Sequence, residues 1–290
     1  EGGDGNDTLT GGLGSDTLVG GAGNDRLFGL VANASSFFDW DRMEGGAGDD
    51  LYQADSRYDV VVENLNDGID TVQSITDFVL PDHVENIELQ GSSVVSGVGN
   101  SLDNVMVGNS NSNNLDGREG ADSMYGGGGN DVYHVDNPGD TVNETPGGGA
   151  LDRVYSMLPT YVLPDNVEIL ELVGILSWDG TGNSLRNMMW GNELANRLDG
   201  ASGADTMWGY GGDDTFVVDN ISDGVYAGDG IDLVESTAIS YTLSSNAENL
   251  TLMGTANIAG AGNALANRLQ GNSGNNQGDC ISHRSKFVLG

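Results

Sequence analysis

The sequence predicts an all-β fold, a right-handed parallel β-roll or β-solenoid built from Gly/Asp-rich nonapeptide repeats with strand-rich connectors. Three observations indicate this. The nine-residue pattern G-G-x-G-x-D-x-U-x, where U is a large apolar residue, occurs three times in succession over residues 2–28. A longer unit also recurs, because Asp50, Asp131 and Asp214 occupy equivalent places at nearly equal intervals. The connectors are rich in Val, Ile, Leu, Thr and Tyr, which favour strands over helices.

Each position of the nonapeptide has a physical role. Glycines at positions one, two and four let the backbone adopt positive φ, which exposes carbonyl oxygens on the inside of a turn. The Asp at position six adds a carboxylate to the same place, and oxygen-only, negatively charged surroundings suit Ca²⁺. The x-U-x that follows is a minimal strand. Repeats this short cannot bury a core alone, so they must stack, with equivalent strands about 4.8 Å apart.

The chain divides into units that each combine a connector with a nonapeptide tract. The final segment departs from the repeat pattern in charge and spacing. The expected units are a tract at 1–62 with an insertion at 29–44, solenoid units at 63–143 and 144–235, a partial unit at 236–279, and a non-repeat tail at 280–290.

The position-eight residues predict the interior of the solenoid. Aromatic residues take this position in the last well-formed copy of each tract, at Tyr52, Tyr133 and Phe216, where we expect the coil to widen. The other members of this interior ladder are Leu9, Leu18, Leu27, Met106, Leu115, Met124, Met189, Leu198, Met207 and Leu269.

The composition restricts the partners. The chain has 290 residues, 44 acidic against 10 basic, and a net charge of −34. Nucleic acid and anionic membrane surfaces are excluded as partners, because they require clustered Lys and Arg. No apolar run is long enough to span a membrane. Without counter-ions the chain repels itself, and a divalent cation would reverse this. Cys280 is the single cysteine, so bound metal rather than a disulfide must supply rigidity.

The tandem copies resemble the RTX (repeats-in-toxin), haemolysin-type calcium-binding repeats. This resemblance implies two nonapeptides per coil and a calcium ion between two loops that lie one coil apart on one edge. One loop gives carbonyls from positions two and four plus its Asp, and the next gives carbonyls from positions one and three plus its Asp. It also implies a secreted bacterial protein exported by type I secretion. The first full site would consist of Gly3, Gly5 and Asp7 with Gly20, Ala22 and Asp25.

The same rule extends the ligand set along the chain. Asp16 has no Asp two nonapeptides further on, because Ala34 falls there. Asp–Asp pairs with this spacing join Asp41 to Asp59, Asp122 to Asp140, Asp205 to Asp223 and Asp214 to Asp232. Beyond the first site, the predicted ligands are Gly12, Gly14, Asp16, Asp41, Gly46, Gly48, Asp50, Asp59, Asp122, Asp131, Asp140, Asp205, Asp214, Asp223, Asp229 and Asp232.

Other interpretations remain open for several positions. Gly/Asp-rich disorder is the alternative for the first loops. Asp59, Asp140 and Asp223 could cap turns instead of binding metal. Phe37, Phe38 and Trp40 could form a sugar-binding patch or a hydrophobic cover. An uncharged amide ladder is the alternative to weak calcium binding for the Asn residues that replace Asp at position six: Asn104, Asn113, Asn187, Asn196, Asn267 and Asn276.

No catalytic motif accompanies the repeats. The three His residues are isolated, and neither His-Glu-x-x-His nor Gly-x-Ser-x-Gly occurs. A carboxylate that recurs in every coil is a metal ligand or a solvated edge, not a single general acid. The sequence therefore predicts a non-catalytic, calcium-folded region of a secreted protein. It begins in mid-repeat at Glu1, so we expect it to be part of a longer protein. One alternative is a spacer of a surface adhesin or matrix protein, with a glycan or cell surface as its partner. The other is the calcium-binding tail of a secreted hydrolase or polysaccharide-modifying enzyme whose catalytic domain lies outside this sequence.

Overall fold

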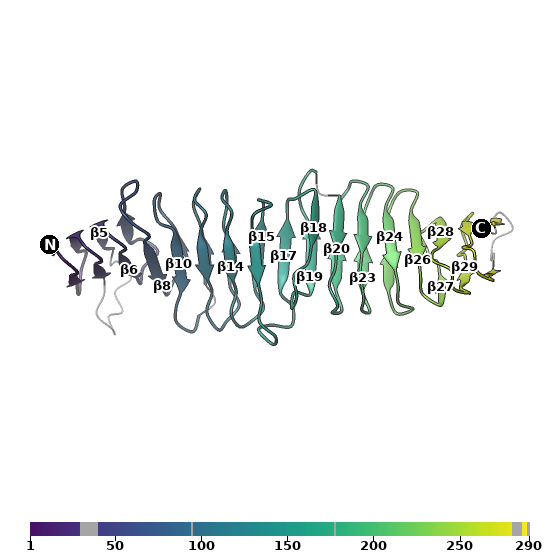
Figure 1. The fold of residues 1–290 in the computed structure, drawn as a ribbon, viewed down its shortest axis with the longest axis horizontal. Helices are drawn as coiled ribbons and strands as arrows, with labels where there is room; N and C mark the ends of the chain where they lie inside the picture. The colour runs from purple at the N-terminus through teal and green to yellow at the C-terminus, as the bar shows by residue number, and fades with distance from the viewer. Residues whose placement is uncertain (30–39, 94, 177, 280–285, 289–290) are drawn as a thin grey trace. The chain divides into compact units, whose positions relative to one another are not determined.

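The protein is described by a computed structural model in which every regular element is a β-strand (Figure 1). It forms two compact units, Glu1–Ala150 and Leu151–Gly290. No helix among the described residues could cross a membrane. Phe37, Phe38 and Cys280 lie outside the described residues, as does most of the predicted tail. The described residues are 1–29, 40–93, 95–176, 178–279 and 286–288.

Successive strands of the first unit alternate between two faces, so each coil adds one strand to each face. All pairing is parallel, which confirms the predicted solenoid. One face is the sheet β2 (Thr8–Thr10), β4 (Arg26–Phe28), β6 (Leu51–Ala54), β8 (Thr71–Ser74), β10 (Asn86–Leu89), β12 (Val105–Val107), β14 (Ser123–Tyr125) and β16 (Thr141–Asn143). The other strands are β1 (Gly3–Asp4), β3 (Thr17–Ala22), β5 (Arg42–Ala47) and β7 (Val60–Val62), then β9 (Phe78–Val79), β11 (Ser96–Val98), β13 (Asn114–Asp116) and β15 (Val132–Val135).

The second unit repeats this arrangement, again with parallel pairing. Its odd-numbered strands are β17 (Arg153–Ser156), β19 (Ile169–Leu172), β21 (Met188–Trp190), β23 (Thr206–Trp208) and β25 (Gly224–Tyr226), followed by β27 (Ser240–Thr242), β29 (Ala259–Ala261) and β31 (Gln277–Asp279). Its even-numbered strands are β18 (Thr160–Val162), β20 (Asp179–Thr181), β22 (Arg197–Asp199), β24 (Thr215–Val218), β26 (Leu233–Ser236), β28 (Asn249–Leu252), β30 (Arg268–Gln270) and β32 (Lys286–Val288).

The strand register gives the length of each coil. Leu9 pairs with Leu27, so a regular coil consists of two nonapeptides, as the repeat spacing predicts. Leu27 then pairs with Tyr52, so this coil is seven residues longer than a regular one. Arg42–Glu44 belong to β5 and pair with β3, so the expected insertion at 29–44 extends too far toward the C-terminus. The coil after Tyr52 is slightly longer than a regular one, since Tyr52 pairs with Val72. Phe216 pairs with Val234 at the regular spacing, so the expected widening is wrong for the third tract.

The position-eight side chains form the core, as predicted. Leu115, Tyr133 and Phe216 are fully buried. Tyr133 pairs with Leu115 and Phe216 pairs with Leu198 of the preceding coil, so apolar side chains stack along the interior. This stack fixes the register of the loops at the edge, because a slip by one residue would turn every core side chain outward.

Candidate metal sites

The Gly-rich loops of the first unit stack closely on one another. Gly3 and Gly5 have φ of 112° and 108°, and Gly21 and Gly23 have φ of 122° and 127°. The carbonyl oxygens of Gly3 and Gly5 lie where a Cβ on Gly21 and Gly23 would be. Both the backbone conformation and the close approach therefore require glycine here. As a result, the carbonyls at positions two and four face the next loop.

The following loop directs its own carbonyls backwards. Ala22 O accepts a hydrogen bond from Gly5 N–H at 2.6 Å. Gly45 O lies 2.7 Å from the place that a Cβ on Gly20 would take. Each gap between two loops is thus lined by carbonyl oxygens from positions two and four on one side and from positions one and three on the other.

The position-six carboxylates form a hydrogen-bonded ladder along the same edge. In each pair the backbone N–H of one Asp donates to Oδ1 of the Asp one coil further on, over 2.6 to 3.0 Å. The pairs run from Asp7 to Asp25, Asp16 to Asp41, Asp25 to Asp50, Asp41 to Asp59, Asp50 to Asp70, Asp122 to Asp140, Asp205 to Asp223 and Asp214 to Asp232.

One expectation about this ladder is wrong. Counting two nonapeptides from Asp16 reaches Ala34, which implied that Asp16 faces no Asp. The register resumes at β5, where Arg42 pairs with Thr17, and Asp16 N–H donates to Asp41 Oδ1 at 2.8 Å. Asp25 and Asp50 are joined across the same interval, at 2.6 Å.

The ladder hydrogen bonds do not use the second carboxylate oxygen, Oδ2, of these Asp side chains. Among the described residues, nine of these Asp side chains have a buried Oδ2 that accepts no hydrogen bond. An unsatisfied buried polar group costs about 1–3 kcal/mol, and more when it is charged. A cation held between the loops would satisfy these atoms, so the donor set fits Ca²⁺. The nine residues are Asp7, Asp16, Asp25, Asp50, Asp70, Asp122, Asp205, Asp214 and Asp232.

Burial also makes six of these carboxylates hard to ionise without a metal, those of Asp50, Asp70, Asp122, Asp205, Asp214 and Asp232. Desolvation is the largest cause of their raised pKa values, and neighbouring carboxylates raise them further. Backbone N–H groups oppose the shift only in part. A bound divalent cation would favour the charged form instead. The pKa rises from 3.8 to about 6 for Asp50 and Asp205, and to about 7 for Asp70, Asp122 and Asp214.

Three predicted ligands have a different geometry. Asp59 Oδ1 accepts from Asp41 N–H, and its Oδ2 accepts from Asp55 N–H at 3.1 Å and Ser56 N–H at 3.0 Å. Both oxygens are therefore occupied by backbone donors, as a turn cap requires. The same arrangement recurs at Asp140, with Asp136 and Asn137 as donors, and at Asp223, with Asp219 and Asn220.

The Asn side chains of the Asn loops are hydrogen-bonded within the protein. Asn104 Oδ1 accepts from Asn100 N–H at 2.8 Å, and its amide donates to Glu85 O at 3.1 Å. Asn100 in turn donates to Pro81 O and Val84 O, both at 2.7 Å. Both amide atoms of Asn104 are therefore used in hydrogen bonds to its own loop and to the connector, so the amide interpretation and weak calcium binding both remain predictions. The leading Asn is a residue that sequence reasoning missed, although Gly-Asn-x-x-x-Asn occurs six times, beginning at Gly99, Gly108, Gly182, Gly191, Gly262 and Gly271.

Sequence reasoning also missed the acidic residues of the connectors. Asp70 N–H donates to Glu85 Oε2 at 2.8 Å, so the ladder of the first unit continues past the nonapeptides. In the second unit, Asp232 N–H donates to Glu248 Oε2 at 2.9 Å. The signal was present, because the Glu falls at the same place in each long repeat.

The remaining predicted ligands occupy loop positions of the same kinds. Asp131 is fully buried, and its Oδ1 accepts from Asn113 N–H at 2.6 Å. Asp229 is exposed, and its N–H donates to Tyr210 O at 2.8 Å. The glycines at positions two and four again have positive φ: Gly12 (109°), Gly14 (100°), Gly46 (102°) and Gly48 (131°).

Comparison with protein-family models agrees with this geometry. The RTX calcium-binding nonapeptide repeat matches in four copies, at residues 1–33, 38–55, 98–133 and 190–220. None of the curated proteins matches the sequence. The matched stretches contain loops whose buried Asp oxygens lack a donor, including those of Asp7, Asp122 and Asp214. These four stretches of the chain are RTX calcium-binding nonapeptide repeats, and the ion that they bind is Ca²⁺.

Proposed function

We propose that the chain is a calcium-folded, non-catalytic repeat region of a secreted bacterial protein. The observation that carries this proposal is the row of buried Asp oxygens without donors. In each site, the first loop supplies the carbonyls of positions two and four and its Asp. The next loop supplies the carbonyls of positions one and three and its Asp. Six oxygens of this kind match the coordination that Ca²⁺ prefers.

The charge of the chain connects calcium to secretion. With a net charge of −34, the metal-free chain is expanded in a calcium-poor cytosol. Outside the cell, millimolar calcium neutralises the loops and folds the chain, in the affinity range of extracellular modules of about 10⁻⁴–10⁻³ M. RTX repeats are typical of secreted bacterial proteins, which supports export by a type I route.

Circular dichroism tests the coupling of calcium to folding. We expect a weak β signal with chelator and a strong one in millimolar Ca²⁺. Mg²⁺ is the control, because it demands tighter octahedral geometry than these carbonyl-rich loops offer and should substitute poorly. An equal β signal with chelator and with Ca²⁺ would show that calcium does not drive folding.

The absence of catalysis needs a separate test. The buried carboxylates of the described residues recur from coil to coil, so none is placed as a unique acid, base or nucleophile. Purified protein should stay at background with peptide, ester and polysaccharide substrates. Activity that is abolished by changing one Asp but not its equivalents in other coils would contradict this part of the proposal.

One surface favours a second candidate role, contact with glycans as part of an adhesin. Trp190, Trp208 and Tyr226 stack in successive coils, with ring centroids 4.8 and 5.3 Å apart. Tyr226 is 58% exposed, and Asp229 and Asn246 line the hollow beside it. Aromatic rings beside polar side chains suit sugar binding. A glycan array probed with the calcium-loaded protein tests this role, and a Tyr226→Ala variant that binds equally well would exclude this surface.

A further inference from the structure

The first tract ends with a loop in which glutamate replaces glycine. Glu44 pairs with Val62 in the register of β5 and β7, so Glu63 occupies the place that Gly45 holds one coil earlier. Position one is glycine in all the preceding good copies, where a Cβ would meet the position-six carboxylate of the same loop, as at Gly20 and Gly45. Glu63 adds a carboxylate there, and its side chain is buried, with the residue only 7% exposed.

Three carboxylates meet at this point. Asp50, Glu63 and Asp70 each place one carboxylate oxygen within 4.8 Å of the others. Asp50 and Asp70 are 2% and 1% exposed, and the Oδ2 atom of each is buried without a hydrogen-bond donor. The cluster is therefore more than a group of acidic residues, since two of its oxygens lack the partner that burial demands.

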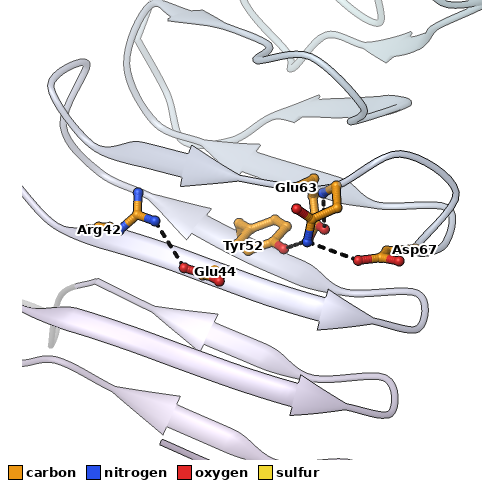
Figure 2. A network of polar contacts seen from close by, with 6 residues as sticks. Arg42, Glu44, Tyr52, Glu63 and Asp67 are labelled. Atoms are coloured by element: carbon orange, nitrogen blue, oxygen red, sulfur yellow. Dashed lines mark hydrogen bonds and ion pairs between the residues drawn. The ribbon is translucent and has the colours of Figure 1, made fainter.

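Glu63 is held in place by its neighbours. The Tyr52 hydroxyl donates to Glu63 Oε1, and Asn64 N–H donates to Oε2 at 3.2 Å (Figure 2). Asn64 is itself fixed by its amide, which donates to Asp67 Oδ2 at 3.0 Å. These contacts fix the orientation of the carboxylate, as second-shell partners do for metal ligands.

The negative charge of the cluster is not balanced by protein cations. Within the described part of the chain, no ion pair joins a basic side chain to Asp50, Glu63 or Asp70. The ion pair drawn in Figure 2 is between Arg42 and Glu44, which are 46% and 38% exposed. A buried group of three carboxylates without a counter-ion is a binding site for a hard divalent cation.

We propose that Asp50, Glu63 and Asp70 bind one Ca²⁺ at the end of the first tract, in a ladder site to which Glu63 adds a third carboxylate. This inference rests on the proposed calcium-dependent function. Three carboxylates give this site more charge than the two of an ordinary loop pair. Because ligand charge raises calcium affinity, it fills before the ordinary sites.

The other tracts provide an internal comparison. In the second tract the Tyr133 hydroxyl donates to Glu144, repeating the arrangement of Tyr52 and Glu63. In the third tract, the equivalent residues are Phe216 and Ala227. The hydroxyl and the carboxylate are thus present together or absent together. This is expected if the tyrosine exists to position the glutamate.

Calcium binding by the full chain tests the proposal. Glu63→Gln keeps the size of the side chain and removes its charge. By isothermal titration and equilibrium dialysis it should bind one fewer Ca²⁺, lost from the tightest class, while circular dichroism at saturating Ca²⁺ stays unchanged. The control is Glu44→Gln, which removes an exposed carboxylate from the same strand edge and should leave the count unaltered.

Two further variants separate ligation from a purely structural contact. Tyr52→Phe should keep the calcium count and weaken the tightest class. If Glu63→Gln does not fold in saturating Ca²⁺, Glu63→Asp, which keeps the charge, should restore both folding and the count.

An unchanged count in folded Glu63→Gln, with Tyr52→Phe equally destabilised, would overturn the inference and leave the proposed function intact. A Glu63→Asp variant that folds but binds one Ca²⁺ fewer than wild-type protein would also overturn the inference and leave the proposed function intact. Wild-type protein that binds no Ca²⁺ would instead refute the proposed function.

Discussion

Replacing Asp122 by Asn separates the cost of a buried charge from the benefit of bound calcium. Asp122 is fully buried, and its Oδ1 accepts from Asn104 N–H at 2.7 Å. Its Oδ2 has no donor. Asn keeps the shape and the Oδ1 acceptor but removes the charge. The same ladder already contains Asn at position 104, so the substitution is compatible with the backbone.

The two conditions should give effects of opposite sign. The pKa of Asp122 is raised from 3.8 to about 7, mainly by burial. A raised pKa means that stability is greatest below the unfolded value and is lost as the pH rises through about 7. At pH 8 without metal, this ionisation destabilises the fold by up to about 4 kcal/mol. Asp122→Asn should therefore help the metal-free chain to fold, and yet require more Ca²⁺ for calcium-driven folding.

Far-UV circular dichroism measures both effects. With chelator, wild-type protein should gain β signal as the pH falls from 8 to 5, and Asp122→Asn should gain it at a higher pH. At pH 8, a calcium titration should show a higher midpoint for the variant. The control is Asp82→Asn, which removes an exposed charge of the same unit and should change neither midpoint appreciably. If Asp122→Asn impairs folding in both conditions, then the carboxylate is structural, and the argument from buried charge is wrong.

Other substitutions test the core, the turns and the Asn loops at saturating Ca²⁺. Leu115→Ala should lower the free energy of unfolding by about 2–5 kcal/mol in denaturant titrations, whereas Val107→Ala, at a 37% exposed position, should change it by about 0.5 kcal/mol or less. Asp140→Ala removes a turn cap and should lower stability by about 1 kcal/mol without changing the calcium count; a lost Ca²⁺ would show that Asp140 is a ligand. Asn104→Ala removes the side-chain acceptor of Asn100 N–H, so it should also destabilise with the count unchanged; a lower count would mean that Asn loops bind metal. Ala201 has φ of 57°, which strains a residue with a Cβ. Ala201→Gly should therefore raise the free energy of unfolding by about 1 kcal/mol, and the melting temperature with it; a lower melting temperature would refute this strain.

The sequence predicts the core better than the edge. The position-eight ladder follows from strict periodicity, and each of its members from Leu18 onward is buried. The partner of Asp16 could not be predicted, because spacing alone does not reveal that the strand register resumes at Arg42. The turn-cap role of Asp59 depends on two N–H groups that converge only when the turn after β6 is formed. Glu63 was missed since it lies one residue past the last recognisable copy, where only the strand register shows that it replaces a glycine.

The structure distinguishes two kinds of loop that the nonapeptide pattern treats as one. The Asn loops use both amide atoms within the protein, and the first of them hydrogen-bonds to the connector turn at Pro81 and Val84. The Asp loops that follow keep one buried oxygen without a donor, as at Asp122 and Asp214. After each of the first two connectors, Asn loops that are hydrogen-bonded within the protein therefore precede Asp loops that keep a buried oxygen without a donor. We expect calcium dependence to be concentrated in the Asp loops, while the Asn loops anchor each connector to the stack. This arrangement explains why replacing Asp by Asn along the chain does not disrupt the solenoid: the exchange substitutes an internal hydrogen bond for a metal ligand at an unchanged position of the backbone.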